Sequence, residues 1–212
     1  MEKRNFDLLF KKVLEKIKDT RPSLLLHVCC GPCSSNVLKE LCEQFEITIL
    51  YANSNIYPEK EYQRRFQELV DFIAQFNQDY SQNIVIIEEP YRPLEFLNHL
   101  NPLKEEKEGG KRCYLCYSLR MESAYRYASS HHFDYWTTVL SVSPHKNSQW
   151  INQIGESKPQ DKTHFLYADF KKNNGYKKSV DMASQYGLYR QNYCGCLFSY
   201  TEMLEKISRT KE

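Results

Sequence analysis

The stretch Ser-Leu-Leu-Leu-His-Val-Cys-Cys-Gly-Pro-Cys, residues 23–33, joins an apolar run to three cysteines. Residues 23–29 predict a buried strand, since a short apolar run bounded by turn residues is typical of a parallel sheet. Gly31 and Pro32 are expected to end this strand, and a cap within residues 34–36 is expected to start the next helix. The segment therefore predicts a strand–turn–helix unit with its cysteines where the strand ends.

Outward from this unit, apolar runs alternate with segments of helical periodicity. The further expected strands are residues 47–52, 84–88, 135–140 and 165–168. The expected helices are an N-terminal helix over 4–19 and helices near 34–45, 62–76, 94–99 and 112–130. This alternation predicts an α/β fold, a Rossmann-like parallel sheet flanked by helices, in a single domain over residues 1–212. The part from about 175 to 212 is expected to be helical and to carry Cys194 and Cys196.

Composition narrows the class of protein. The chain has 212 residues, of which 41% are hydrophobic and 26% charged, which excludes disordered and collagen-like proteins. Its net charge of +2 is too small to indicate a nucleic-acid-binding protein through bulk charge. The first twenty residues lack the apolar core of a secretory signal, and no apolar run is long enough for a membrane span. A cytoplasmic protein without membrane attachment is expected.

The eight cysteines are unusual for such a chain, because a cytoplasmic protein uses thiols for metal binding or redox chemistry more than for disulfide frameworks. Cys42 lies at an apolar helix position and is expected in the core. The other seven form three groups: Cys29, Cys30 and Cys33; Cys113 and Cys116; Cys194 and Cys196. The groups are about 80 residues apart, which argues against separate zinc fingers. Residue types alone leave an iron–sulfur centre and one structural zinc equally open.

Each group carries its own alternatives. The helical spacing of Cys113 and Cys116 puts both thiols on one face with Arg120, which either holds an anion or is an ordinary surface arginine. Cys33, near a helix start, is expected to have a lowered pKa and to be a ligand or reactive group, or else a small packed residue. The pair Cys194-Gly195-Cys196 is expected to close a strained, reducible disulfide, or to supply two more metal ligands.

Four segments together resemble one family: LHVCCGPC at residues 26–33, CYLCYSLR at 113–120, SVSPHKN at 141–147 and YCGC at 193–196. The family is the epoxyqueuosine reductases of the QueH type. The resemblance implies a nucleotide α-hydrolase-like Rossmannoid fold and an enzyme that reduces epoxyqueuosine to queuosine at the tRNA wobble position, the last step of queuosine synthesis. It does not imply ATP use, and no glycine-rich phosphate loop follows the first expected strand.

The resemblance also implies roles for the cysteines. Four of them would ligate a [4Fe-4S] cluster: Cys29, Cys30, Cys113 and Cys116. Cys194 and Cys196 would form a redox-active disulfide, and Cys33 would contribute to a second, mononuclear metal. The proton donor is left open among His27, His145 and Tyr193, and the electron donor is an unidentified partner.

Contacts with substrate and tRNA are expected from basic residues, since single-stranded RNA is held by cations and aromatic rings. The candidates are Arg120, His145 and Lys146, the lysine patch of Lys171, Lys172, Lys177 and Lys178, and the charged loop 104–112. Both the patch and the loop also fit a solvated surface. Two other functions stay open: an ATP-dependent PP-loop tRNA thiolation enzyme, which needs a phosphate loop, and a zinc-stabilised tRNA-binding module.

Overall fold

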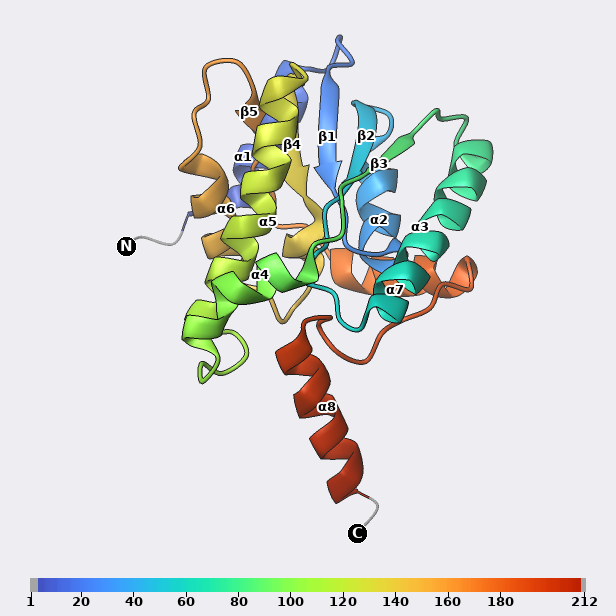
Figure 1. Cartoon of the computed structure of the whole chain (residues 1–212). Coiled ribbons are helices and arrows are strands. Elements are labelled where there is room, and N and C mark those ends of the chain that lie inside the picture. Colours follow the sequence, from blue (N-terminus) through green and yellow to red (C-terminus); the bar gives the residue numbers. More distant parts are fainter. Residues whose placement is uncertain (1–3, 211–212) are drawn as a thin grey trace.

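A five-stranded parallel sheet forms the centre of the computed structural model, which describes residues 4–210 (Figure 1). The strands are β1 (Ser23–His27), β2 (Glu46–Tyr51), β3 (Val85–Glu88), β4 (Tyr135–Thr138) and β5 (His164–Phe165). Their order is β3-β2-β1-β4-β5, and each neighbouring pair is parallel. The chain thus winds outward from β1 in both directions, and the carboxyl ends of β1 and β4 flank a topological switch point, where such folds place their sites.

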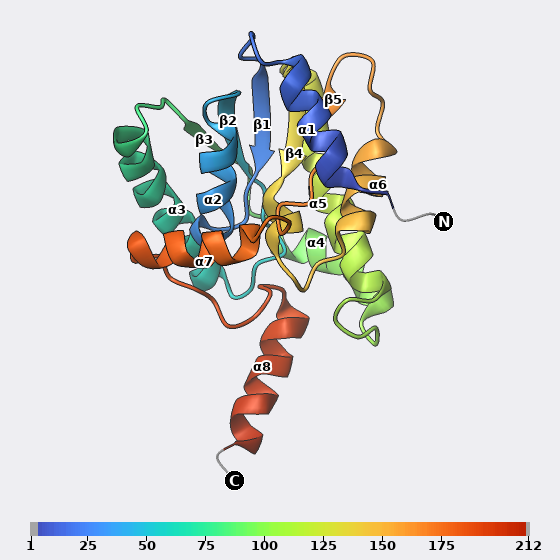
Figure 2. The same ribbon diagram turned by 180° about the vertical axis from the view of Figure 1, so that it is seen from behind.

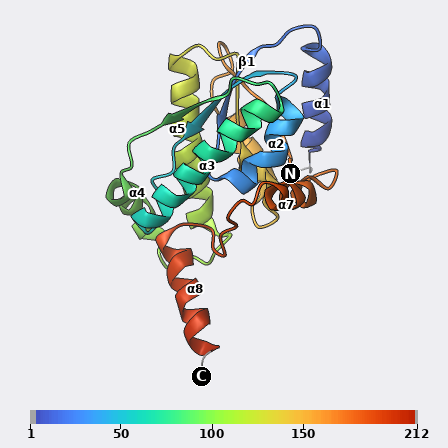
Figure 3. The ribbon, with the colours of Figure 1, turned by 90° about the vertical axis from the view of Figure 1, so that its right-hand side faces the viewer.

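Helices cover both faces of this sheet. They are α1 (Phe6–Lys16), α2 (Gly31–Leu41), α3 (Glu59–Asp79), α4 (Pro93–Leu100), α5 (Lys111–Ser130), α6 (Ser148–Glu156), α7 (Gly175–Gln185) and α8 (Leu197–Arg209), with 3-10 turns η1 (Asn101–Leu103) and η2 (Val139–Val142). Helices α1 and α2 lie on the face turned to the viewer in Figure 2, and the side view shows the sheet between them and α5 (Figure 3). The prediction of a Rossmann-like parallel sheet flanked by helices is confirmed.

The core lies between the sheet and these helices. Leu24, Leu25 and Leu26 of β1 are fully buried, because this central strand has helices on both of its faces. Trp136 of β4 is also fully buried. Cys42 is buried within the same core, so its assignment as a core residue is confirmed.

The turn after β1 differs from its prediction. Helix α2 begins at Gly31 with Cys30 as its extended N-cap residue, so the expectation of a cap within residues 34–36 is wrong. Pro32 lies in the first turn, where a missing N–H leaves no hydrogen bond unmade. The hydroxyl of Ser34 instead donates to the Gly31 carbonyl at 2.9 Å. Cys30 and Cys33 therefore belong to the first turn of α2, and Cys29 directly precedes it.

The end of the chain is helical only in part. Residues 186–196 form a non-helical connection between α7 and α8, so Cys194 and Cys196 precede α8 on a loop. Helix α8 points away from the sheet (Figures 1 and 3). The predicted helix over 4–19 runs from Phe6 to Lys16, and residues 211–212 of the predicted C-terminal part lie outside the described residues. None of the helices within residues 4–210 combines the length and the apolar character that crossing a bilayer requires.

Candidate active site

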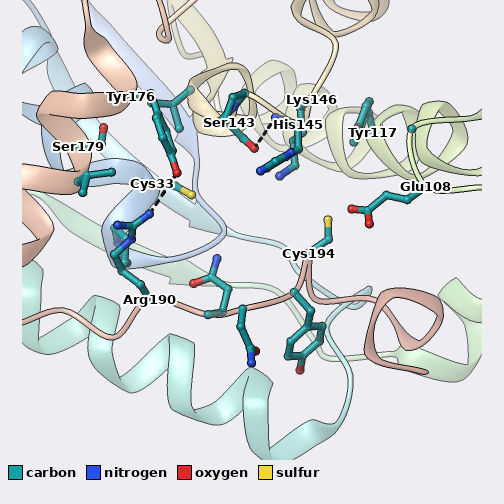
Figure 4. Close-up of a pocket in the computed structure, with 18 residues that line it drawn as sticks. Cys33, Glu108, Tyr117, Ser143, His145, Lys146, Tyr176, Ser179, Arg190 and Cys194 are labelled. Carbon is teal, nitrogen blue, oxygen red and sulfur yellow. Dashed lines mark hydrogen bonds between the residues drawn. The ribbon is translucent and has the colours of Figure 1, made fainter. Parts of the chain in front are cut away.

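A cavity of about 590 Å³ opens at the carboxyl ends of the strands. Its walls come from the start of α2, the side of α5, the loop after η2, the first turns of α7 and the segment before α8. Figure 4 shows Cys33 on one wall and Cys194 on another, with His145 and Lys146 on the loop above them. Two cysteines from opposite ends of the sequence thus face one space.

The first thiol group, Cys29, Cys30 and Cys33, lies at the base of this region. The three Sγ atoms are all within 4.8 Å of one another, and those of Cys29 and Cys30 are 3.9 Å apart. Cys29 and Cys30 are buried, whereas Cys33 is half-buried. Among residues 4–210, no other group of three or more His, Cys, Asp or Glu has this geometry. Thiolates so grouped are able to hold a metal ion.

The pKa values of these thiols diverge because they share hydrogen bonds. Bonds from the Cys30 and Cys33 thiols, followed by the charges of Arg120 and Lys146, hold the pKa of Cys29 well below its usual value. The bond to Cys29 raises the pKa of Cys30 to about 12. Bonds to Cys29 and Cys30, with burial, hold the pKa of Cys33 well above its usual value. The predicted lowering of the Cys33 pKa is therefore wrong, because the shared thiol bonds outweigh the helix N-terminus.

The second group, Cys113 and Cys116, lies on the first turns of α5. The backbone N–H of Gly109 donates to Cys113 Sγ at 3.2 Å, and burial raises the pKa of Cys116 to about 12. Arg120 follows one turn later and is 4% exposed, so its interpretation as a surface arginine is wrong. Its Nη2 donates to Asn53 Oδ1 at 2.6 Å. Arg120 interacts electrostatically with both Cys116 and Cys29, so its charge acts on the first and the second thiol group.

The third group, Cys194 and Cys196, faces two different spaces. Cys194 lines the large cavity, whereas Cys196 lines a smaller one of about 220 Å³ on the side of α4. Cys196 is the N-cap residue of α8, and its Sγ accepts a hydrogen bond from the Ser199 N–H at 3.5 Å. Gly195 between them has φ +123°, a conformation that favours glycine. In this structure both cysteines are thiols.

Arg65 of α3 is the residue that sequence reasoning missed. Its side chain is 1% exposed, its Nε donates to Glu61 Oε1 at 2.7 Å, and its Nη1 donates to the Cys194 carbonyl at 3.4 Å. A Cβ on Gly195 would lie 2.8 Å from Nη1, so the loop rests directly on this guanidinium. The helical spacing does indicate that Arg65 is buried, because it lies three residues after Tyr62 and four before Leu69, on the apolar face of its helix.

The loop after η2 brings two predicted substrate contacts to the cavity. His145 is exposed on its wall, and Lys146 beside it is half-buried. Burial lowers the pKa of Lys146, but its electrostatic interactions with Cys194, Cys29 and Cys33 outweigh burial, and the net pKa is raised. Lys146 therefore carries its charge between the first and third thiol groups.

Two other candidate proton donors have their polar atoms engaged elsewhere. His27 is fully buried in β1, with Nδ1 2.8 Å from Thr138 Oγ1 and Nε2 3.3 Å from the Ala52 carbonyl. Burial, followed by the charge of Arg120, lowers its pKa to about 3, so its ring is neutral. The Tyr193 hydroxyl donates to the Tyr57 carbonyl at 2.6 Å. Among the described residues, the His145 side chain forms no such hydrogen bond, since only its backbone N–H is bonded, to Ser143. It is the one of the three candidates whose ring is not held in this way.

The basic residues proposed for tRNA divide into exposed and buried ones. Lys172, Lys177 and Lys178 are exposed around the start of α7, and Lys171 is half-buried and pairs with Asp169 at 3.1 Å. In the charged loop 104–112, Arg112 is 4% exposed. Its Nη1 donates to the Lys104 carbonyl at 2.7 Å, and its guanidinium lies 4.2 Å from the centre of the Phe198 ring. Arg112 thus connects α5 to α8 through its contact with Phe198.

Comparison with known proteins identifies the family. The family model described as "Epoxyqueuosine reductase QueH" matches residues 24–202. The chain belongs to this family. A QueH protein named epoxyqueuosine reductase from Streptococcus pyogenes serotype M1 is 42% identical over 93% of this chain and 79% of its own length. The QueH proteins of Staphylococcus aureus strain Mu50 and Thermotoga maritima are 39% and 33% identical, over 93% and 89% of this chain and 85% and 97% of their own lengths.

The QueH family is a family of oxidoreductases, and the chain is therefore an oxidoreductase. Among solved structures, an NH3-dependent NAD synthetase from Campylobacter jejuni aligns with 60% of this chain and 53% of its own, at 15% identity and a TM-score of 0.28. That score lies below the level at which a shared fold is inferred.

Proposed function

We propose that this chain reduces epoxyqueuosine to queuosine at the wobble position of tRNA. The reaction adds two electrons and two protons to the epoxide, whose oxygen leaves as water while the ring carbons form a double bond. One observation supports this assignment most: Cys33 and Cys194, from separate thiol groups, line one cavity together with the cation Lys146. Reducing groups and a positive charge therefore meet in a space of the size that holds a nucleoside.

The donor chemistry suits an iron–sulfur cofactor, and of the four proposed ligands Cys29 and Cys30 belong to the thiol group whose Sγ atoms lie within 4.8 Å of one another. Cys29, Cys30, Cys113 and Cys116 would hold a [4Fe-4S] cluster, which supplies one-electron transfers when bound. A cluster on four thiolates carries negative charge, and its buried site needs cations. Two guanidinium nitrogens, Arg65 Nη2 and Arg120 Nε, are buried without a hydrogen-bond partner among the described residues. The charge of both residues and these spare donors suit an anionic group at this position.

Cys33 has a separate role in this proposal. Its thiol is half-buried and lines the cavity, whereas Cys29 and Cys30 behind it are buried. We assign it to a second, mononuclear metal beside the cluster. The charge of Lys146 acts on this thiol and on Cys29.

Cys194 and Cys196 would supply the electron pair. Two thiols that close a disulfide release two electrons and two protons, which balances the conversion of one epoxide to an alkene and one water. An electron donor of unidentified nature then reduces the disulfide again. In the present structure the Cys196 thiol caps α8, so pairing with Cys194 requires that it leave Ser199. Gly195 gives the loop the backbone freedom for this change.

The basic residues would bind the substrate. Lys146 and His145 line the cavity and contact the nucleoside, and Arg120 supports the thiolates from behind. The lysines at residues 171, 172, 177 and 178 bind tRNA phosphates. The first strand-to-helix turn carries thiols where a PP-loop enzyme needs a phosphate loop, which favours reduction over thiolation.

The test is anaerobic incubation of the iron-reconstituted protein with epoxyqueuosine-containing tRNA and a reductant, followed by mass spectrometry of the nucleosides. Loss of the mass of one oxygen atom is the expected result. Cys42→Ala is the matched control, because Cys42 is a buried thiol outside the three groups and should leave the reaction unchanged. Colourless protein with stoichiometric zinc and no reduction would instead support the zinc-stabilised binding module.

A further inference from the structure

An exposed aromatic residue at the rim of the cavity has no role in the reaction proposed above. Tyr176 lies in the first turn of α7, lines the cavity, and is 39% exposed. Arg190, from the connection to α8, donates from Nη2 to the Tyr176 hydroxyl at 3.2 Å (Figure 4). The two side chains thus form a pair at the open side of the cavity.

The backbone under Tyr176 is held in one position. Asn174, the residue that precedes α7, has a left-handed conformation with φ +61°. A Cβ on Gly175 would lie 1.9 Å from the Phe170 carbonyl oxygen, so this position accepts only glycine. Helix α7 packs against α2, which starts at the first thiol group. The Tyr176 ring therefore projects from a platform fixed relative to the thiols.

The charges around Tyr176 favour an anionic ligand. Arg190 and Lys146 both line the cavity, as does one carboxylate, that of Glu108, and neither cation forms an ion pair with a carboxylate within residues 4–210. The exposed lysines 172, 177 and 178 continue the positive charge along the start of α7. An exposed aromatic ring beside a track of cations is the arrangement that binds single-stranded nucleic acid, because every base offers a face for stacking.

We infer that Tyr176 and Arg190 form a docking site for the single-stranded loop of tRNA at the cavity rim. Tyr176 stacks on the base next to the modified nucleotide, and Arg190 binds a backbone phosphate. This places the modified nucleoside in the cavity between Cys33, Cys194 and Lys146. The inference rests on the proposed function for the identity of the RNA, but the docking itself requires no reduction.

The test measures binding of fluorescently labelled tRNA that carries guanosine at the wobble position, so that its outcome is independent of catalysis. Tyr176→Ala should weaken binding about 5- to 150-fold, because base stacking on an aromatic ring contributes that range. Tyr176→Phe keeps the ring and should bind within about 2-fold of the wild type. Arg190→Gln should weaken binding and reduce the slope of log affinity against log salt by about 0.7, the contribution of one phosphate of a single strand.

Two matched controls separate docking from general changes of surface. Tyr114 is 40% exposed on α5, and Arg126 is exposed on the same helix; neither lines the cavity. Tyr114→Ala and Arg126→Gln should bind tRNA as the wild type does. A duplex RNA of equal charge should bind Tyr176→Ala and the wild type equally, because its bases are already stacked.

Unchanged tRNA affinity in folded Tyr176→Ala, checked by circular dichroism, would overturn the inference, as would equal losses for duplex RNA. If the wild type binds tRNA through Tyr176 but fails to reduce epoxyqueuosine, the proposed reaction is wrong while the docking site stands. If it reduces epoxyqueuosine and Tyr176→Ala binds normally, the docking site is wrong while the reaction stands.

Discussion

Residues 29–33 and residues 194–196 both bring thiols to the cavity region, but the fold holds them differently. The first segment follows the central strand and runs into α2, and Cys29 and Cys30 are 8% and 0% exposed. The second lies on a loop between helices, with both cysteines half-buried and a glycine of positive φ between them. A fixed cage suits metal ligands, whereas a dithiol that alternates with a disulfide needs room to move. The contrast separates thiols suited to binding from thiols suited to reacting.

The largest expected effect comes from removing one thiol of the fixed segment, residues 29–33. Cys29→Ala should lower bound iron and reduce turnover by roughly 100-fold or more, because a cluster that loses a thiolate becomes labile. Iron assay and nucleoside mass spectrometry measure the two effects. Cys42→Ala, the buried control, should change neither. Full iron content in Cys29→Ala would remove this residue from the ligand set, and the same test applies to Cys30, Cys113 and Cys116.

The loop should respond in the opposite way. A variant with Ser at both 194 and 196 should keep its iron and its visible spectrum but lose turnover, also by roughly 100-fold, because the two-electron carrier is gone while the cage is intact. Thiol counting should find one oxidised pair in the wild type after exposure to air. Loss of iron from the double variant would erase the contrast and make both cysteines metal ligands.

A smaller effect tests how the loop rests on the fold. Gly195→Ala should lower the free energy of unfolding by about 2–4 kcal/mol, because an alanine is strained at positive φ and its Cβ meets Arg65. Gly187→Ala is the matched control: its φ is +62° with nothing within 4 Å of the added Cβ, so a loss of about 1–2 kcal/mol from backbone strain is expected. Urea unfolding compares the two, and equal losses would show that Arg65 yields easily.

The smallest effect concerns the surface beyond both segments. Changing Lys172, Lys177 and Lys178 to Gln should weaken tRNA binding and lower the salt slope by about 0.7 for each phosphate that is no longer neutralised. Lys171→Gln should do less, since this lysine already pairs with Asp169. Equivalent changes at the exposed residues 12, 16 and 18 of the N-terminal region form the control. An unchanged slope in the triple variant would leave the patch facing only solvent.

Sequence periodicity predicted the parallel sheet because mainly apolar segments alternate with segments of helical spacing. It did not predict α6, the helix between β4 and β5. The predicted start of the helix after β1 was wrong. Gly31 and Pro32 were expected to break the chain, but a proline in the first turn of a helix costs no hydrogen bond, and α2 begins there. The spacing of the cysteines thus predicted the three thiol groups. It did not predict the helix start that brings Cys29, Cys30 and Cys33 together.

What the sequence could not predict depends on neighbours that are distant along the chain. Arg65 follows ordinary helical spacing, and its role emerges only when the 194–196 loop lies on it. The pKa of Cys33 was predicted from its helix alone, whereas the thiols of Cys29 and Cys30 decide it. Arg120 is likewise buried, and its partner Asn53 lies on the loop after β2, far from it in the sequence.

The hydrogen bond from Gln191 Nε2 to Cys30 Sγ, 3.5 Å long, joins positions 161 residues apart. It therefore joins parts of the chain that are synthesised at different times. Cys30 is synthesised before Gln191, which follows it by 161 residues and belongs to the cavity wall. Contacts between such distant positions form late, because closing a long loop costs entropy before any contact rewards it. A metal bound to the first thiol group before residue 191 is in place would therefore occupy a site that lacks this wall.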